Sequence, residues 1–331
     1  MKILITGGNG FVGRLLCAEL YNRGQAVRAA VRSAKSPVEN AEVAVVGPID
    51  SETVWTDALR GVEVIIHLAA RVHVMKETAS DPLAEFLKVN LHGSVNLARQ
   101  AVQAGVKRLV YVSSIGVNGN GTDGAHIFSE TDNPRPHNNY ALSKWQAEQA
   151  LREISRETGL EVVVVRPPLV YGQAAKGNFP RLLAAINKGV PLPVAGAHNA
   201  RSLVYAGNLV DALITCATHP AAAGQTYLVC DGEDVSTALL VEKIAAALGR
   251  NSCSFYFPPV LLRAAATVLG RSEQIDSLFG SLRVSNEKIC SELGWVPPFT
   301  LEQGLRMTAD WYLKQGSRKG AGRMNGETHR I

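Results

Sequence analysis

The chain has 331 residues, 46% of them hydrophobic and 19% charged, which describes a soluble globular protein with an ample core. Most of the formal net charge of +5 lies in the basic stretch after Leu313, and the basic residues form no stripe with interleaved aromatic side chains. Nucleic acid is therefore excluded as the expected partner.

The cysteines and the apolar runs point to the cell compartment. Five cysteines are scattered without CxxC spacing, so we expect reduced thiols and a cytoplasmic protein. No apolar run approaches the roughly 20 residues that a membrane-spanning helix needs. We expect neither a membrane span nor a metal site.

The first half alternates short apolar runs with amphipathic segments, which is the pattern of βαβ units and a parallel sheet. Strands are predicted at 2–6, 26–31, 42–46, 64–68, 108–113 and 161–166, and helices at 10–23, 53–60, 82–103 and 139–158. The last strand is a continuous apolar run and should lie in the sheet interior. We therefore predict an α/β fold, a Rossmann-type doubly wound parallel sheet, with residues 1–166 as the NAD(P)-binding domain.

Beyond Pro167-Pro168 the periodicity becomes irregular. Helices are predicted at 182–188, 209–217, 237–248 and 300–313, and extended segments at 191–194, 201–205 and 226–229. The apolar stretch 258–269 predicts a buried or lid helix. We expect a smaller substrate-binding region over 167–313, a portion near 201–229 that returns to the first domain, and a basic flexible tail at 314–331.

Glycines follow the first predicted strand at the start of a helix. Gly7, Gly10 and Gly13 permit a tight turn and let a pyrophosphate approach backbone N–H groups at the positive end of the helix. Phe11 and Val12 lie between them. These five residues are predicted to bind a dinucleotide.

The end of the second strand bears on which dinucleotide binds. An acidic residue there would bind the ribose 2′-hydroxyl of NAD. The chain has Arg32 and Ser33 instead, which can hold a 2′-phosphate. The sequence therefore favours NADP, with NAD as the second choice if Arg32 is a solvated loop residue.

Two further segments should line the cofactor. Asp50, after Ile49, is placed either to accept a hydrogen bond from an adenine amino group or to cap the helix before Thr53. His67 ends a buried strand and is more simply a structural histidine than a proton donor. The small residues Leu68-Ala69-Ala70 after it leave room for the cofactor backbone.

The catalytic prediction rests on Tyr140 and Lys144. Tyr140 follows Ser114 by 26 residues. Residues i and i+4 share a helix face, so the Lys144 ammonium can lie near the Tyr140 phenol. A neighbouring cation would lower a phenol pKa that is ordinarily about 10. A tyrosine so adjusted exchanges a proton with a carbonyl or an alcohol oxygen, as redox chemistry on a nicotinamide cofactor requires.

Several segments in order resemble the extended short-chain dehydrogenase/reductases, and within them the NAD-dependent nucleotide-sugar epimerase/dehydratase branch. They are the glycine loop, His67-Leu68-Ala69-Ala70, Val89-Asn90-Leu91-His92-Gly93-Ser94, Val112-Ser113-Ser114 and Tyr140-xxx-Lys144. The resemblance covers residues 1 to about 313. It implies that Ser114, with Ser113 as a near neighbour, completes a triad with Tyr140 and Lys144.

The resemblance also implies further contacts. Asn90 and Pro167 would lie with Tyr140 and Lys144 against the cofactor. Asn178 and Arg201 would contact a nucleoside-diphosphate sugar together with Ser114, unless they are surface loop residues; a guanidinium can clamp diphosphate oxygens. The family implies a homodimer formed through the helices at 82–103 and 139–158.

Two departures from the family pattern narrow the reaction. The run Arg166-Pro167-Pro168 lacks the asparagine that many 4-epimerases and dehydratases carry shortly after it, and Ser114 is followed by Ile115-Gly116 in place of the acid pair of dehydratases. The resemblance therefore favours NAD(P)-dependent reduction of a UDP-4-keto-6-deoxy-N-acetylhexosamine in surface-polysaccharide precursor synthesis. A UDP-hexose (UDP-glucose or UDP-GlcNAc) 4-epimerase is the close alternative. A non-catalytic NAD(P)-binding scaffold is disfavoured, because such proteins typically lose the tyrosine or the lysine.

Overall fold

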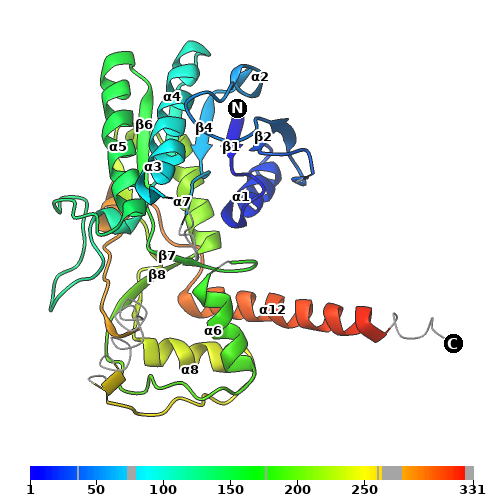
Figure 1. Ribbon diagram of the computed structural model, residues 1–331, viewed down its shortest axis with the longest axis vertical. Coiled ribbons are helices and arrows are strands. Elements are labelled where there is room, and N and C mark those ends of the chain that lie inside the picture. Colours follow the sequence, from blue (N-terminus) through cyan, green and yellow to red (C-terminus); the bar gives the residue numbers. More distant parts are fainter. Residues whose placement is uncertain (36, 73–79, 176, 259–260, 263–277, 325–331) are drawn as a thin grey trace.

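A seven-stranded parallel sheet forms the larger part of the computed structural model (Figure 1). Its strands are β1 (Lys2–Thr6), β2 (Ala26–Val31), β3 (Glu42–Val45), β4 (Val64–His67), β5 (Arg108–Val112), β6 (Glu161–Arg166) and β9 (Thr226–Leu228). The structure describes residues 1–35, 37–72, 80–175, 177–258, 261–262 and 278–324. Most of the stretch 258–269, predicted as a buried or lid helix, falls outside these residues.

The strand order is β3-β2-β1-β4-β5-β6-β9, so the direction of winding reverses between β1 and β4. Ile5 pairs in parallel register with Ala29 of β2 on one side and with Ile66 of β4 on the other. In a doubly wound sheet, ligands bind at such a reversal, outside the carboxyl ends of the strands. The predicted Rossmann-type fold is confirmed.

β6 lies between β5 and β9, in the interior of the sheet. Its valines, Val162–Val165, are all buried. A parallel strand covered on both faces needs apolar residues at successive positions. The prediction of an interior strand from this unbroken apolar run is therefore confirmed.

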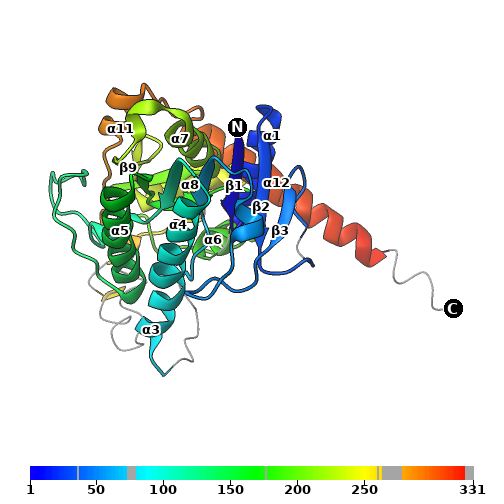
Figure 2. The same ribbon diagram turned by 90° about the horizontal axis from the view of Figure 1, so that it is seen from above.

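Alternate residues of β1 face two separate helical layers. Ile3 and Ile5 join a core with α1 (Phe11–Asn22) and α7 (Ala206–Thr218), whereas Leu4 joins a core with α4 (Gly93–Gln103) and α5 (Asn139–Thr158). The alternation follows from the two-residue period of a strand. Figure 2 shows the two helical layers on opposite sides of the sheet.

The helix predicted over 82–103 contains a π-helical turn. Its successive elements are α3 (Pro82–Leu87), η1 (Lys88–His92) and α4. Asp81 caps its start by accepting a hydrogen bond from the backbone N of Ala84 at 3.0 Å. The first residue of α4 is Gly93, where a Cβ would lie 2.6 Å from the Ile49 Cγ2. A glycine there lets the helix pack closely against the loop after β3.

A second, three-stranded sheet lies at the carboxyl edge of the first (Figure 1). β8 (Arg201–Tyr205) is central, with β7 (Leu169–Tyr171) parallel and β10 (Asp234–Val235) antiparallel to it. β7 starts three residues after β6 ends, which places this sheet beyond the carboxyl ends of the large one. Its core is shared with three helices, α6 (Asn178–Asn187), α8 (Thr237–Ala247) and α12 (Leu301–Met324).

Several predicted segments differ from the structure. The helix predicted at 53–60 is limited to α2 (Thr56–Leu59), and the extended segment at 191–194 is a turn with one bridge, from Leu192 to Ser254. α12 continues to Met324, past the predicted end at 313, so the first part of the tail predicted to be flexible is helical. It projects from the rest of the chain in Figures 1 and 2.

The domain boundaries remain a prediction. The portion near 201–229, predicted to return to the first domain, is split between the two sheets. β9 pairs with β6, and α7 packs in the layer of α1, whereas β8 lies in the small sheet. Further short helices are η2 (Ile115–Val117), η3 (Pro220–Ala222) and α11 (Glu287–Leu293). All five cysteines are free thiols. Within the described ranges, no helix combines the length and apolarity needed to cross a membrane.

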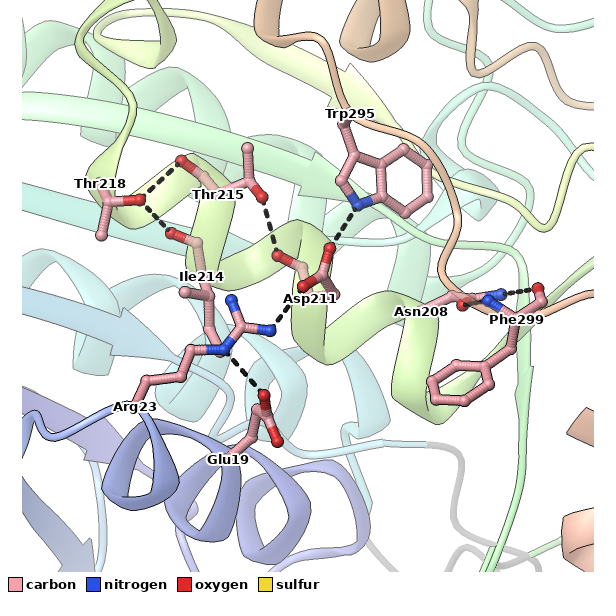
Figure 3. A network of polar contacts seen from close by, with 9 residues as sticks. All are labelled: Glu19, Arg23, Asn208, Asp211, Ile214, Thr215, Thr218, Trp295 and Phe299. Carbon is pink, nitrogen blue, oxygen red and sulfur yellow. Dashed lines mark hydrogen bonds and ion pairs between the residues drawn. The ribbon is translucent and has the colours of Figure 1, made fainter.

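Asp211 of α7 links a residue just after α1 to a residue in the segment before α12 (Figure 3). Its Oδ1 accepts a hydrogen bond from the Arg23 guanidinium at 2.6 Å, just after α1, and its Oδ2 accepts one from the Trp295 indole at 3.0 Å. Nearby, Asn208 exchanges two hydrogen bonds with the backbone of Phe299, at 2.8 and 2.9 Å. α7 therefore holds both the end of α1 and the segment that leads into α12.

We predict that Asp211→Ala lowers the free energy of unfolding by about 1–3 kcal/mol, because the indole N–H and the guanidinium both lose a charged acceptor. Urea denaturation followed by circular dichroism measures the loss. Asp57→Ala is the matched control, since Asp57 pairs with Arg60 on the surface with both side chains largely exposed. It should change the stability by less than about 1 kcal/mol. Equal losses in the two variants would contradict the assignment.

Candidate active site

The glycine turn after β1 has no room for side chains. The backbone N of Gly10 donates a hydrogen bond to the Gly7 carbonyl at 2.8 Å, and Gly7 has a φ of +68°. A Cβ on Gly13 would lie 2.2 Å from the same carbonyl, and one on Gly10 would lie 3.0 Å from it. The turn therefore depends on glycine at the predicted positions, and it delivers the chain directly into α1.

The first turn of α1 can receive an anion. Gly10 is its N-cap residue, and among the described residues no side chain caps it. The first N–H groups of a helix have no partner within the helix, and the helix dipole favours negative charge there. Val12 packs against the core, and Phe11 approaches Gly172, where a Cβ would lie 3.4 Å from the ring. The turn fits the pyrophosphate of a dinucleotide, with Phe11 and Val12 orienting the helix.

Arg32 and Ser33 follow β2 directly, and both are exposed. The Ser33 hydroxyl accepts a hydrogen bond from the backbone N of Lys35 at 3.3 Å. The sequence around them contains no carboxylate at the end of this strand. A cation and a hydroxyl therefore stand at the position where a Rossmann fold receives the adenine ribose.

Asp50 caps a local turn. Its Oδ1 accepts hydrogen bonds from the backbone N of Glu52 at 3.0 Å and from the Thr53 hydroxyl at 3.3 Å. Asp50 does not cap a helix, because α2 begins three residues after Thr53 and its N-cap residue is Trp55; the contact with an adenine amino group stays a prediction. The side chain of Ile49 is pressed against Gly93 at the start of α4. The loop after β3 is thereby held against the second helical layer.

His67 is a structural residue, as predicted. Its Nδ1 lies 2.6 Å from the Thr6 hydroxyl and its Nε2 lies 2.9 Å from the Ser94 hydroxyl. Burial, with the Lys144 charge as a lesser cause, lowers the pKa of His67 to about 3, so the ring is neutral. Thr6 also accepts a hydrogen bond from the Ala69 backbone N at 3.1 Å. This places Leu68-Ala69-Ala70 beside the glycine turn.

Asn90 holds the loop after β4. Its Oδ1 accepts from the backbone N of Arg71 at 2.8 Å, and its Nδ2 donates to the Arg71 carbonyl at 3.0 Å and to the Ser143 hydroxyl at 2.9 Å. Both N–H groups of the buried amide are engaged. Asn90 thus joins this loop to α5, and the cofactor contact expected from the sequence stays a prediction.

The two serines after β5 point to different partners. The Ser113 hydroxyl donates to the carboxylate of Glu148 at 2.5 Å and is buried. Ser114 is only partly buried; its Oγ accepts from the backbone N of Gly116 at 3.1 Å, and its side chain hydrogen-bonds the Tyr140 phenol. Ser114 is therefore the serine available to the predicted triad.

Tyr140 lies in the first turn of α5. The helix is capped by Asn138, whose Oδ1 accepts from the backbone N of Ala141 at 2.8 Å. Phe86 of α3 presents its ring edge to Tyr140, with 6.2 Å between ring centres. Burial raises the pKa of Tyr140 to about 12, and the hydrogen bond with Ser114 opposes that rise.

Lys144 shares the helix face of Tyr140 but directs its charge to β5. Its Nζ donates to the Val112 carbonyl at 2.7 Å and lies 4.4 Å from the centre of the Tyr111 ring. Burial lowers the pKa of Lys144 to about 7, against the opposing charge of Glu148. The prediction that Lys144 lowers the pKa of Tyr140 is wrong in this structure, because the ammonium is engaged at the end of β5 and burial dominates at the phenol.

The predicted substrate residues lie with the small sheet. Asn178 is the exposed first residue of α6, and Arg201 is the first residue of β8. The Arg201 guanidinium donates to the Gly280 carbonyl at 3.0 Å, and burial lowers its pKa. Pro167 is buried at the end of β6 and accepts from the backbone N of Ile115 at 3.0 Å. It shapes the edge of the site and has no side-chain polar group to offer.

Glu148 and Arg166 are the site residues that the sequence reasoning missed. Glu148 is fully buried and accepts from the Arg166 guanidinium at 2.9 Å through Nε and at 2.5 Å through Nη2. One signal was present: Glu148 follows Tyr140 and Lys144 at the next i+4 position, on the same helix face. In the part of the chain that the structure describes, no three His, Cys, Asp or Glu side chains gather as metal ligands.

Comparisons with known proteins agree with this geometry. The sequence profile of the NAD dependent epimerase/dehydratase family matches residues 3–230. A UDP-glucose 4-epimerase of Vibrio cholerae is 40% identical over 319 residues, which cover 96% of this chain and 97% of that protein. The N-acetyl-alpha-D-glucosaminyl-diphospho-ditrans,octacis-undecaprenol 4-epimerase of Escherichia coli O157:H7 is 27% identical, over 94% of this chain and 95% of that protein.

Solved structures extend the similarity to three dimensions. MoeE5 in complex with UDP-glucose and NAD has a TM-score of 0.76 and 26% identity, covering 95% of this chain and 99% of its own. The Thermus thermophilus UDP-glucose 4-epimerase in complex with NAD has a TM-score of 0.75 and 26% identity, covering 94% and 99%. Sequence and fold are thus similar over nearly the whole length.

Proposed function

The chain belongs to the NAD-dependent epimerase/dehydratase family, and from that membership we propose that this enzyme reduces the 4-keto group of a nucleotide sugar. The substrate we propose is a UDP-4-keto-6-deoxy-N-acetylhexosamine, an intermediate of surface-polysaccharide precursor synthesis. The observation that carries the proposal is a neutral phenol, Tyr140, beside the hydroxyl of Ser114. A partly buried phenol that stays protonated at neutral pH is an acid ready to protonate an oxygen, which is what a reductase needs.

Ser114, Tyr140 and Lys144 each have a separate role at the C4 carbonyl of the substrate. The hydride taken up by C4 is supplied by the nicotinamide dinucleotide when it is bound. Ser114 donates a hydrogen bond to the carbonyl oxygen as negative charge develops on it. Tyr140 then gives its proton to that oxygen, since an alkoxide is a stronger base than a phenolate even when burial raises the phenol pKa to about 12. Lys144 supplies a cation on the same helix face as the phenolate that remains.

NADP is the cofactor we propose, with NAD as the alternative. The glycine turn accepts the pyrophosphate of either one. The exposed Arg32 and Ser33, with no carboxylate beside them, suit a 2′-phosphate. NAD accompanies MoeE5 and the Thermus thermophilus epimerase in their structures, which supports the alternative.

A UDP-hexose 4-epimerase is the second candidate, and the 40% identity to the Vibrio cholerae UDP-glucose 4-epimerase is the observation that favours it. An epimerase must first take a proton from the C4 hydroxyl, so it works from the phenolate of its tyrosine. The raised pKa of Tyr140 opposes that ionisation. Electrostatics at the phenol therefore favour the reductase.

We propose that the enzyme works as a homodimer. α3, α4 and α5 together form one outer layer of the large sheet (Figure 2), where a second copy could pair with them. The α5 that would pair also carries Tyr140 and Lys144, so pairing would brace the site. Light scattering of the purified protein should give the mass of two chains; the mass of one chain would reject the proposal.

We predict that the purified enzyme oxidises NADPH with a UDP-4-keto-6-deoxy-N-acetylhexosamine, and that Tyr140→Phe lowers kcat at least about 100-fold by removing the proton donor. The dissociation constant of the cofactor should stay unchanged. Tyr21→Phe, at an exposed tyrosine of α1, is the matched control and should leave kcat as it is. Full turnover by Tyr140→Phe would reject the proton donor. Tightly held NAD with interconversion of UDP-GlcNAc and UDP-GalNAc would establish the epimerase instead.

We predict that Arg32→Ala weakens NADPH binding about tenfold and leaves NADH binding unchanged, because a guanidinium contacts only the 2′-phosphate form. Fluorescence titration with both cofactors measures the ratio. Lys35→Ala, at an exposed cation in the same loop, is the control and should affect neither. An equal effect of Arg32→Ala on both cofactors would show that Arg32 does not discriminate between them.

A further inference from the structure

Glu148 stands where three elements of the site meet. It follows Tyr140 and Lys144 on the buried face of α5. Its carboxylate accepts from the hydroxyl of Ser113, the residue after β5, and from the guanidinium of Arg166, the last residue of β6. One carboxylate therefore ties the carboxyl ends of β5 and β6 to the helix that carries the proton donor.

The guanidinium extends this connection to the loop after Ser114. Arg166 Nη1 donates to the Asn118 Oδ1 at 3.0 Å, and Asn118 Nδ2 donates to the Ser129 carbonyl at 2.9 Å. Arg166, Asn118 and Glu148 are all buried. Breaking such a pair on one side leaves an uncompensated charge in the interior. The chain is thus fixed on both sides of Ser114, at Ser113 through Glu148 and at Asn118 through Arg166.

The charged and titratable groups that face Lys144 give Glu148 a second effect. From β5 the facing groups are the Tyr111 ring and the Val112 carbonyl, from β4 the neutral His67, and from α5 itself Glu148, whose carboxyl group Arg152 approaches to 3.6 Å. Among these groups Glu148 is the acidic side chain. Its charge opposes the loss of the Lys144 proton that burial promotes.

We propose that Glu148 is a positioning residue of this site: held by Arg166, its carboxylate fixes the Ser113-Ser114 strand end against α5 and places an acidic group one helical turn from Lys144. Glu148 does this without touching substrate or cofactor. The consequence for turnover rests on the proposed function, whereas the consequence for Lys144 is a property of the protein alone.

The charge effect is tested on the protein without substrate, by NMR titration of lysines labelled with carbon-13 at Cε. The Lys144 signal is assigned by its loss in Lys144→Met. In the native chain its midpoint should fall near 7, and in Glu148→Gln it should move down by roughly one pH unit, because the facing negative charge is gone. Glu161→Gln is the control: Glu161 pairs with Arg108 at the opposite ends of β5 and β6, and its loss should leave the midpoint in place.

A second variant guards against misfolding. Glu148→Gln leaves the Arg166 charge buried alone, so the double variant Glu148→Gln/Arg166→Met, which removes both charges, is titrated beside it. Its Lys144 midpoint should fall by less than in Glu148→Gln, because the Arg166 cation, which disfavours a second positive charge nearby, is removed together with the carboxylate. A Glu148→Gln midpoint that stays at the native value, or a double-variant midpoint that lies below that of Glu148→Gln, would overturn the charge effect whatever the substrate is.

The positioning effect is tested by Ser113→Ala, which keeps the carboxylate and removes its bond to the strand end. With the proposed substrate, kcat should fall about tenfold with KM unchanged, since Ser114 is no longer held in place, while the Lys144 midpoint stays native. An unchanged kcat would overturn this half of the proposal. A native enzyme inactive on the 4-keto sugar, with the midpoint shift of Glu148→Gln intact, would reject the proposed function and leave the role of Glu148 standing.

Discussion

Lys144 holds its amine inside the protein, where burial lowers its pKa to about 7, and the contacts of that amine organise the site. Its Nζ donates to the Val112 carbonyl and lies over the Tyr111 ring, so the end of β5 supplies the contacts that water would otherwise make. Burying a charge is costly unless it is hydrogen-bonded and paired. Glu148, one turn further along α5, is the neighbouring acidic side chain and is itself held by Arg166. These contacts connect β5, β6 and α5 at the site.

The rest of the fold places the glycine turn and the small sheet at the same edge of the large sheet as Lys144. The reversal between β1 and β4 puts the glycine turn at the carboxyl edge of the large sheet, and the small sheet starts from the same edge after β6. A second buried carboxylate, Asp231, joins the two parts: it accepts from the backbone N of Tyr205 at 2.8 Å, from Asn208 at 2.7 Å and from the Tyr171 hydroxyl at 3.0 Å. Helix α7 is thus fixed to the small sheet through Asp231. Through Asp211 it is fixed to the end of α1 and to the segment before α12.

Periodicity and glycine spacing predicted the frame, because they report directly on which face of an element is buried. The bounds of β2, β6 and α5 match the prediction, and the glycine turn is tight enough to exclude a Cβ at Gly13, where it would lie 2.2 Å from the Gly7 carbonyl oxygen. The same reasoning failed where the answer depends on a distant partner. The i, i+4 spacing placed Lys144 on the face of Tyr140, but the destination of its Nζ is set by Val112, 32 residues earlier. The π turn around Asn90 and the extension of α12 to Met324 likewise have no local signal in the sequence.

Burial keeps Tyr140 a neutral acid at neutral pH, and the proposed proton transfer depends on this. Titration of the protein labelled with tyrosine carrying carbon-13 at Cζ, compared with Tyr140→Phe to identify the signal, reads that ionisation directly. A phenol without burial would be half ionised near pH 10. The structure predicts that the Tyr140 signal is still that of the protonated phenol at that pH. A phenolate signal appearing near pH 7 would contradict the account.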